Sequence, residues 1–252
     1  MSILEVKDLY KRFGGLEATK NVSFTVERGE ILGILGPNGA GKTTIFNQIA
    51  GAFAPTSGQI LFEGADITGK SANVIANCGL ARTFQIPKPL QGLTVLENVL
   101  IPCYSERIIR ILGNRKAAPD WARRVLETVE LEHKADQLVD RLTHGELKKL
   151  ELAKALALKP AIVMLDEPFA GLGTQEVAPI SAAIKKLNVE QGLTVLIIEH
   201  KLKEFMKLVH RVVALNYGEK IGEGTPTSII SNPLVIEAYL GKGGAAIANT
   251  GN

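Results

Sequence analysis

The segment from residue 36 to residue 44 combines glycines, a lysine and hydroxyl side chains at the spacing of a phosphate-binding loop. Glycines let successive backbone N–H groups turn inward around phosphate oxygens, and the positive end of a following helix adds to the attraction. Lys42 is expected to reach the β- and γ-phosphates of a nucleotide, and Thr43 to hold Mg²⁺. The predicted phosphate contacts come from Gly36, Pro37, Asn38, Gly39, Ala40, Gly41, Lys42, Thr43 and Thr44.

Two adjacent carboxylates, Asp166 and Glu167, follow an apolar run that ends at Leu165. Open α/β sheets place their ligand sites at the ends of such buried strands. We expect Asp166 to be a Mg²⁺ partner, and Glu167 to be the base for an attacking water or the group that orients it. His200 ends the next apolar run and is expected to help neutralise charge on a γ-phosphate. The predicted chemistry is hydrolysis of a nucleoside triphosphate.

A third segment, residues 142–156 (LTHGELKKLELAKAL), resembles the LSGGQ signature of ATP-binding cassette (ABC) ATPases. The phosphate loop, Gln85, this signature, the Asp166-Glu167 pair and His200 stand in the order of that family, and the resemblance covers nearly the whole chain. It implies a cassette that dimerises head to tail around two ATP molecules. Each ATP would lie between the phosphate loop of one subunit and the signature of the other.

The same resemblance implies roles for single residues. Gln85 would be a catalytic residue that meets Mg²⁺ or the attacking water and reports the nucleotide state to a partner. Phe13 stands where the family stacks an aromatic ring on adenine; burial of Phe13 is the alternative, and Tyr10 is the alternative stacking residue. The predicted signature contacts to the γ-phosphate are Thr143, Gly145 and Glu146.

Three positions depart from the family pattern. Thr143 replaces the signature serine but keeps its hydroxyl group, so the phosphate contact is retained in principle. His144 replaces the first glycine of the signature, which we interpret as a tolerated substitution rather than a loss of function. Gly173 stands where most members carry the aspartate of the D-loop, so coupling between the two ATP sites is the least secure of the implied properties.

A finer resemblance is to the ATPases of branched-chain amino acid (LIV-type) transporters. It implies ATP and Mg²⁺ as cofactors and import of hydrophobic amino acids. The implied partners are a second identical or different ABC ATPase, two integral membrane permease subunits and an extracytoplasmic solute-binding protein. Urea, amide and lipopolysaccharide systems, and soluble ABC ATPases that act on nucleic acid or ribosomes, are the alternatives. The matching segments begin at Arg12, Gly79, Leu93, Gly145, Ala170 and Glu199.

The elements that must position these residues indicate an α/β P-loop fold with a mixed RecA-like core sheet. Uniformly apolar runs at 31–35, 161–165 and 194–198 predict buried parallel strands. Alternation over the first thirty residues and at 60–62 predicts an N-terminal antiparallel β-subdomain. Helical periodicity over 94–158, with Trp121 as a packing residue, predicts an inserted α-helical subdomain at about 88–160.

Near the C-terminus, residues 212–221 predict a hairpin. We therefore expect a single domain over residues 1–240 and a flexible tail over 241–252. Prolines at 87 and 89 indicate an extended loop after Gln85, and by resemblance residues 85–104 would receive a helix of the permease.

Composition excludes other classes of protein. The net charge of +3 is spread along the chain, which argues against a nucleic-acid partner. No apolar run approaches the roughly 20 residues that span a bilayer, and the N-terminus has no signal sequence, so we expect a cytoplasmic protein held peripherally at the inner face of the membrane by its permease. Cys78 and Cys103 have no metal-ligand spacing and are expected to be buried as small apolar residues.

Overall fold

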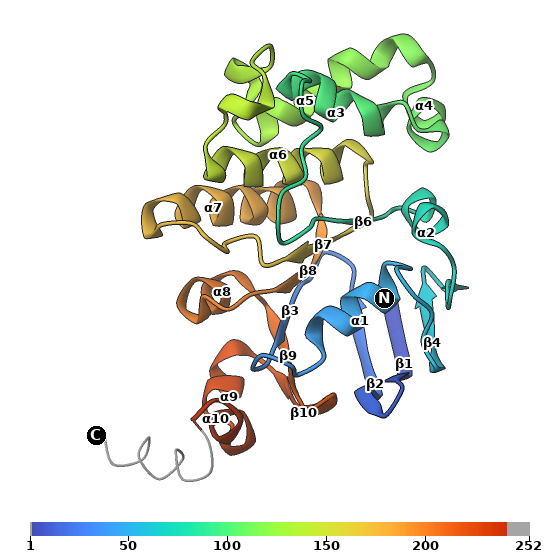
Figure 1. The fold of residues 1–252 in the computed structure, drawn as a ribbon, viewed down its shortest axis with the longest axis vertical. Helices are drawn as coiled ribbons and strands as arrows, with labels where there is room; N and C mark the ends of the chain where they lie inside the picture. The colour runs from blue at the N-terminus through green and yellow to red at the C-terminus, as the bar shows by residue number, and fades with distance from the viewer. Residues whose placement is uncertain (1, 241–252) are drawn as a thin grey trace. The chain divides into compact units, whose positions relative to one another are not determined.

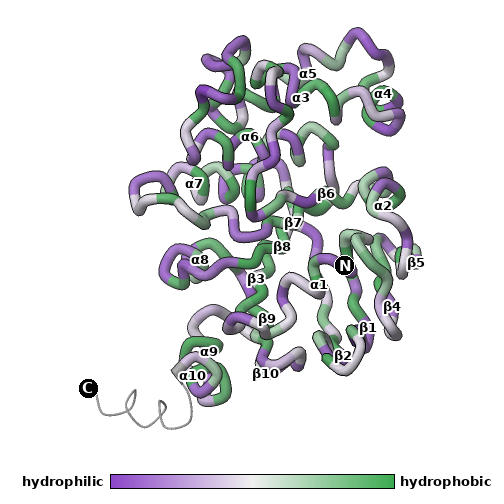
Figure 2. The backbone as a smooth tube through the Cα atoms, viewed as in Figure 1, coloured by the Kyte–Doolittle hydropathy of each residue, from purple (hydrophilic) through white to green (hydrophobic). Residues whose placement is uncertain are grey.

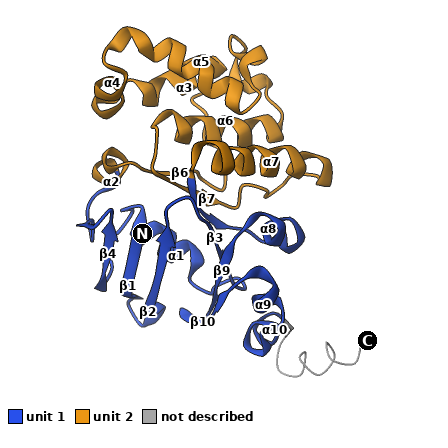
Figure 3. Cartoon of the chain, turned by 180° about the vertical axis from the view of Figure 1, so that it is seen from behind, with its two compact units in different colours: residues 1–72, 194–252 blue, residues 73–193 orange. Residues whose placement is uncertain are grey.

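The computed structural model describes residues 2–240, and the chain divides into two compact units (Figure 3). Unit 1 comprises residues 1–72 and 194–252, and unit 2 comprises residues 73–193. The predicted tail from Gly241 lies outside the described residues. The assignment of residues 1–240 to a single domain with a helical insertion at about 88–160 stays a prediction.

Unit 1 contains a four-stranded antiparallel sheet, as the alternating pattern predicts (Figure 1). Val6 of β1 pairs with Phe24 of β2 and with Ile60 of β4, and all three side chains are buried. Successive side chains of a strand point to opposite faces, so this alternation leaves the other face polar. In the order of the sheet, the strands are β2 (Leu16–Glu27), β1 (Ser2–Phe13), β4 (Ser57–Phe62) and β5 (Ala65–Asp66).

Two strands of unit 1, β3 (Ile31–Leu35) and β8 (Thr194–Ile198), are mostly hydrophobic and are buried along their whole length (Figure 2). Strand β3 runs parallel to both β8 and β9, and β10 closes a hairpin with β9. Gly33 in β3 has no room for a side chain, because a Cβ atom there would lie 2.2 Å from the ring of Phe205. The strands, in their spatial order, are β10 (Glu219–Gly224), β9 (Arg211–Asn216), β3 (Ile31–Leu35) and β8 (Thr194–Ile198).

Within its described residues, unit 1 has one helix directly after its phosphate loop and three helices in its C-terminal segment. The first one starts directly after the loop and buries Ile45, Phe46 and Ile49 completely, which fixes the direction of its N-terminus. The helices are α1 (Lys42–Ile49), α8 (Leu202–Leu208), α9 (Pro226–Ile230) and α10 (Pro233–Leu240).

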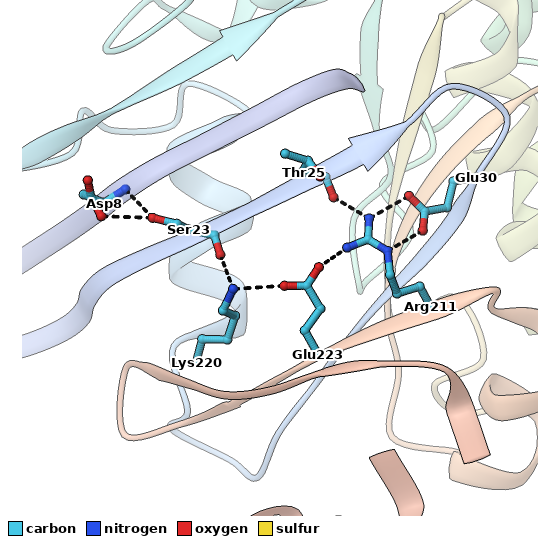
Figure 4. A network of polar contacts seen from close by, with 7 residues as sticks. All are labelled: Asp8, Ser23, Thr25, Glu30, Arg211, Lys220 and Glu223. Carbon is cyan, nitrogen blue, oxygen red and sulfur yellow. Dashed lines mark hydrogen bonds and ion pairs between the residues drawn. The ribbon is translucent and has the colours of Figure 1, made fainter. Parts of the chain in front are cut away.

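A network of charged side chains ties the hairpin of β9 and β10 to the antiparallel sheet (Figure 4). Both guanidinium edges of Arg211 are used: Nε and Nη2 donate to the carboxylate of Glu30 at 2.8 and 2.9 Å, and Nη1 pairs with Glu223. Nη2 also donates to the Thr25 carbonyl at 2.7 Å, and Lys220 donates to the Ser23 carbonyl at 2.7 Å. The hairpin is thereby fixed to β2.

Unit 2 is mainly helical around two short parallel strands, β6 (Leu80–Arg82) and β7 (Ile162–Asp166). Its helices α3, α5 and α6 pack on one another, with Val99, Leu126 and Leu150 completely buried. Among residues 2–240, no helix is both long and apolar enough to span a membrane. The helices of this unit are α2 (Ala72–Cys78), α3 (Val95–Cys103), α4 (Glu106–Leu112), α5 (Ala118–Thr128), α6 (His144–Ala157) and α7 (Thr174–Gln191), with short 3₁₀ turns at Arg115–Ala117, Glu132–Lys134 and Val139–Arg141.

Two predictions for single residues have different outcomes. The indole N–H of Trp121 donates to the carbonyl of Ala157 at 2.9 Å, which confirms its packing role between α5 and α6. Cys103 is buried as predicted, but the prediction for Cys78 is wrong, because this residue is exposed. It ends α2, a short helix whose one buried residue is Ile75, so the helix covers too little apolar surface to enclose its last turn.

Candidate functional site

The phosphate loop of unit 1 connects β3 to α1 and uses its glycines where no side chain fits. A Cβ atom at Gly36 would lie 2.4 Å from the carbonyl oxygen of Leu215. A Cβ atom at Gly41 would lie 2.5 Å from the carbonyl oxygen of Ala18, and Gly41 also has a left-handed φ of +97°. Both conditions exclude other residues. The glycine spacing of the motif therefore reflects close packing as well as access for phosphate.

Lys42 and Thr43 occupy the first turn of α1. The ammonium group of Lys42 donates to the carbonyls of Gly36 and Pro37 at 2.7 and 2.9 Å and is buried within its own loop. The hydroxyl-bearing Thr43 is exposed. A helix N-terminus preceded by glycines, with a lysine held inside the loop, is suited to bind an anionic phosphate.

The loop is supported from behind by the C-terminal part of unit 1. The backbone N–H of Gly36 donates to the hydroxyl oxygen of Tyr239 in α10 at 3.0 Å. The N–H of Gly218, at the turn of the β9–β10 hairpin, donates to the carbonyl of Ala40 at 3.1 Å. Sequence reasoning missed Tyr239, because nothing in the local pattern links α10 to a loop about 200 residues earlier in the chain.

Phe13 lies at the end of β1 and is 45% exposed, so the alternative of a buried Phe13 is wrong. Its ring meets the ring of Phe53 edge to face at 5.3 Å, and the ammonium of Lys11 lies 5.0 Å from the centre of each ring. The hydroxyl of Tyr10 donates to Glu17 at 2.7 Å, which raises the pKa of Tyr10 and holds its ring in the sheet. Of the two aromatic candidates, Phe13 has the more accessible face.

His200 follows β8 in unit 1. Its backbone N–H donates to the carboxylate of the buried Glu199 at 2.9 Å, and the N–H of Lys201 donates to the same oxygen at 3.2 Å. The side chain of His200 is exposed. Glu199 therefore turns the chain immediately after the strand and directs the imidazole outward.

In unit 2 the two predicted carboxylates end β7 in different surroundings. Asp166 is 4% exposed and forms an ion pair with Arg82 of β6, 2.7 Å from Nη2 to Oδ2. Glu167 has a left-handed φ of +49°, which is rare for a residue with a side chain. Its Oε2 accepts a hydrogen bond from Nε2 of Gln85 at 2.6 Å. Two residues that the sequence assigned to hydrolysis are thus in direct contact.

Arg82 is a residue that sequence reasoning missed. It stands within the Gln85 segment, three positions before the glutamine, and nothing in its spacing predicts a carboxylate partner 84 residues away. A buried carboxylate is stable only beside a cation or hydrogen-bond donors, so burial of Asp166 predicts a positively charged side chain close to it. That cation is supplied by the neighbouring strand.

The signature begins α6 with a capping box. Thr143 Oγ1 accepts the N–H of Glu146 at 3.3 Å, and Glu146 Oε2 accepts the N–H of Thr143 at 2.9 Å. Burial acts to raise the pKa of Glu146, but its ion pair with Lys134 and the two bonds to Thr143 outweigh this and lower the pKa. The Thr-x-x-Glu spacing is itself a helix-start signal, which the signature comparison overlooked. Thr143 remains exposed, with its hydroxyl proton available to a ligand.

His144 contacts the segment that follows Glu167. Its Nε2 lies 3.1 Å from the carbonyl oxygen of Ala170 and only 2.8 Å from where a Cβ atom of residue 171 would be. A Cβ atom at Gly145 would lie 3.0 Å from Oε1 of Glu176, whose other oxygen accepts the N–H of Gly173 at 2.8 Å. His144 is thus an exposed substitution that makes a new contact in place of glycine.

The predicted site residues fall into two sets. Unit 1 carries the phosphate loop, Phe13 and His200, and unit 2 carries Gln85, the signature and the Asp166-Glu167 pair. Within the described part of the chain, no three acidic, histidine or cysteine side chains form a ready metal cluster. Among the predicted metal ligands, unit 1 offers the hydroxyl of Thr43, and unit 2 offers the side-chain amide of Gln85 and the carboxylate of Asp166. Oxygen donors of these kinds are the ones that Mg²⁺ takes in proteins.

Comparisons with known proteins identify the family of the chain. The ABC transporter family matches residues 19–170, and the branched-chain amino acid ATP-binding cassette transporter family matches residues 219–245. The chain is 38% identical to the high-affinity branched-chain amino acid transport ATP-binding protein BraF of Pseudomonas aeruginosa, covering 95% of this chain and 98% of BraF. It is 37% identical to LivG of Escherichia coli, with the same coverage.

Solved structures lead to the same family. The crystal structure of the ADP conformation of MJ1267, an ATP-binding cassette of an ABC transporter, is 33% identical, has a TM-score of 0.86 and covers 96% of this chain and 100% of MJ1267. A dimeric post-hydrolysis structure of the cassette MJ0796 bound to ADP and Pi is 27% identical, with a TM-score of 0.76 over 88% of this chain and 98% of MJ0796. The chain therefore belongs to the ABC transporter family of ATP-hydrolysing cassettes, in the branch that includes LivG and BraF.

Proposed function

We propose that this chain is the ATP-hydrolysing subunit of an ABC importer for branched-chain amino acids, and that Glu167 and Gln85 act on the attacking water. The observation that carries the catalytic assignment is the 2.6 Å hydrogen bond between Gln85 Nε2 and Glu167 Oε2. A carboxylate held beside an amide can accept the proton of a water while the amide orients it. Hydrolysis of ATP would then supply the energy for transport.

The phosphate loop would bind ATP from one side. Lys42 would exchange its bonds to the carbonyls of Gly36 and Pro37 for bonds to the β- and γ-phosphates. Thr43, Asp166 and Gln85 would hold Mg²⁺, which supplies neutralising charge on the phosphates when bound. His200 would add a further donor to the γ-phosphate. Phe13, with Lys11 and Phe53 beside it, would stack on adenine.

Dimerisation would complete the site. The hydroxyl of Thr143 and the backbone of Gly145 start α6, whose N-terminus can attract a phosphate group as the phosphate loop does. The dimeric structure of the cassette MJ0796 bound to ADP and Pi supports assembly as a dimer. The partner would be a second copy of this chain or a different cassette of the same family.

Exposed apolar residues in unit 2 support a contact with a membrane subunit. Phe84, the loop that follows Gln85, α3 and its C-cap residue Tyr104 expose large apolar side chains. Exposed apolar patches of this kind mark sites of protein–protein interaction. We propose that these side chains receive the permease, which would hold the chain peripherally at the cytoplasmic face of the membrane. They are Phe84 (50% exposed), Ile86 (71%), Leu90 (45%), Ile101 (49%) and Tyr104 (37%).

The catalytic assignment is tested with Glu167→Gln, compared with Glu127→Gln at an exposed position of α5. We expect Glu167→Gln to lower phosphate release by about a hundredfold or more, as loss of a general base does, and to accumulate an ATP-bound dimer on size-exclusion chromatography. Glu127→Gln should match the original chain. A monomeric Glu167→Gln variant with full turnover would refute the assignment.

The substrate assignment needs the whole complex. Purified with its permease and solute-binding protein, the transporter should bind leucine, isoleucine or valine and raise its ATPase rate when the loaded binding protein is added. Binding of urea, an amide or a lipid instead would place the chain in one of the related systems. Co-purification with nucleic acid and without a membrane protein would contradict the transport function as a whole.

A further inference from the structure

Lys148 is a buried lysine that belongs to none of the assigned positions of the site. It lies one turn into α6 and is 5% exposed. Burial of an ammonium group is costly unless hydrogen-bond acceptors surround it. Its Nζ donates to the carbonyl of Gln85 at 2.6 Å and to the carbonyl of Glu167 at 3.2 Å. One side chain of the signature helix thus binds the backbone of both residues assigned to the attacking water.

The contact between Lys148 and the Glu167 carbonyl matters because the backbone of Glu167 is in a strained, left-handed conformation. A φ of +49° is unfavourable for a residue with a Cβ atom, and such conformations persist where surrounding contacts determine them. The bond from Lys148 to the Glu167 carbonyl is one such contact. The side-chain bond between Gln85 and Glu167 then depends on both backbones being held at the correct separation.

The same face of α6 continues the attachment along the loop. Glu151 Oε1 accepts the backbone N–H of Lys88 at 3.2 Å, and Lys154 Nζ donates to the carbonyl of Lys88 at 2.9 Å. Lys148, Glu151 and Lys154 are spaced by three residues, so they share one face of the helix. The sequence predicts an extended loop after Gln85, and in the structure α6 holds the backbone of this segment at Gln85 and again at Lys88.

We propose that Lys148 is a positioning residue that sets the hydrolytic geometry of Gln85 and Glu167 from the signature helix. It does not contact the reacting atoms itself. Loss of its ammonium group would let the Gln85 loop and the Glu167 backbone separate, while the phosphate loop in unit 1 stays intact. Hydrolysis should therefore fall without a matching loss of ATP binding. The proposal rests on the assignment of Gln85 and Glu167 made above.

The test compares Lys148→Met, which keeps the unbranched apolar stem of the side chain without its ammonium group, with Lys149→Met. Lys149 is the neighbouring lysine of α6; its side chain is 19% exposed and pairs with Glu130, which is 74% exposed, so it carries the same charge on the same helix without the contacts to Gln85 and Glu167. We expect Lys148→Met to lower kcat by about ten- to a hundredfold, as misplacement of a catalytic group does, with KM for ATP within about twofold of the original. Lys149→Met should leave both constants unchanged. Wild-type kcat in a folded Lys148→Met variant, or a raised KM at unchanged kcat, would overturn the proposal.

A double-mutant cycle separates positioning from general destabilisation. If Lys148 acts through the Gln85–Glu167 pair, the variant Glu167→Gln with Lys148→Met should lose little more activity than Glu167→Gln alone. Multiplicative losses would overturn the proposal. If Lys148→Met does not fold, the cycle is run with Lys148→Gln, whose shorter neutral side chain keeps N–H donors but lacks the reach and charge of the ammonium group. Failure of the functional assignment itself gives a different result, because Glu167→Gln would then retain its turnover.

Discussion

The hydroxyl oxygen of Tyr239 accepts a hydrogen bond from the backbone N–H of Gly36, 3.0 Å away, so the last described helix supports the first residue of the phosphate loop. Tyr239 falls within residues 219–245, the segment that matches the branched-chain amino acid cassette family. Support of the loop is thus a structural role for part of that segment.

Tyr239→Phe removes this one bond and keeps the ring. A net hydrogen bond is worth about 1 kcal/mol, so we expect the free energy of unfolding to fall by that amount. If the loop becomes less ordered, ATP affinity should fall by about fivefold. The measurements are urea unfolding and nucleotide titration, with Tyr217→Phe, at a 77% exposed position, as the control. Equal affinities for the two variants would show that the bond does not order the loop.

Arg82 and Asp166 form the most buried ion pair of the predicted site, with side chains 11% and 5% exposed. Removing one partner of such a pair leaves an uncompensated charge, so Arg82→Met should cost about 3 kcal/mol of unfolding free energy. Arg123→Met, which breaks an exposed pair with Glu132, should cost less than about 1 kcal/mol. Thermal and urea unfolding check both values. A cost for Arg82→Met no larger than that of Arg123→Met would contradict this account.

The signature capping box predicts a pH dependence. The pKa of Glu146 is lowered from its ordinary value of 4.5 in the folded chain, so its charged form stabilises the fold above that value. The stabilisation is lost as pH falls through the lowered folded pKa. Glu146→Gln should remove this contribution while keeping a side chain that can cap the helix.

The measurement is urea unfolding of the original chain and Glu146→Gln from pH 7 down to the acid limit of folding. The difference in unfolding free energy should be constant near neutral pH and shrink below about pH 4.5. A difference that grows as the pH falls would have the wrong sign and would assign the effect to another group.

The two cysteines should react at very different rates. Burial raises the pKa of Cys103 to about 12, so its thiolate is scarce at neutral pH, whereas Cys78 is exposed. A thiol reagent should label one cysteine in the folded chain and two after unfolding. Cys78→Ser should abolish the fast reaction. Two thiols of equal rate in the folded chain would contradict the burial of Cys103.

Much of the fold follows from local pattern. Continuous apolar runs predict β3, β7 and β8, because strands buried on both faces have no polar positions to interrupt them. The role of β9 is harder to predict: its sequence indicates a hairpin with β10, and only the structure adds its parallel pairing with β3. Hairpin partners are neighbours in sequence, whereas parallel partners are set by the packing of the whole unit.

The site is predicted unevenly for the same reason. The phosphate loop, Glu167 and Gln85 are recognisable because their chemistry fixes both residue type and spacing. Arg82, Lys148 and Tyr239 act on those residues from distant parts of the chain. Their contacts depend on where strands and helices come to lie in space, which residue type alone does not reveal.

The imidazole of His144 occupies the space that a side chain at position 171 would need. These two positions therefore form a single steric unit, and their residue types are expected to vary together among related cassettes. Grafting a standard signature with glycine at 144 into this chain would open a gap beside Ala170, and grafting a bulkier residue at 171 would expel the histidine. An engineered exchange of signatures between cassettes should move residues 142–146 and 170–173 as one module.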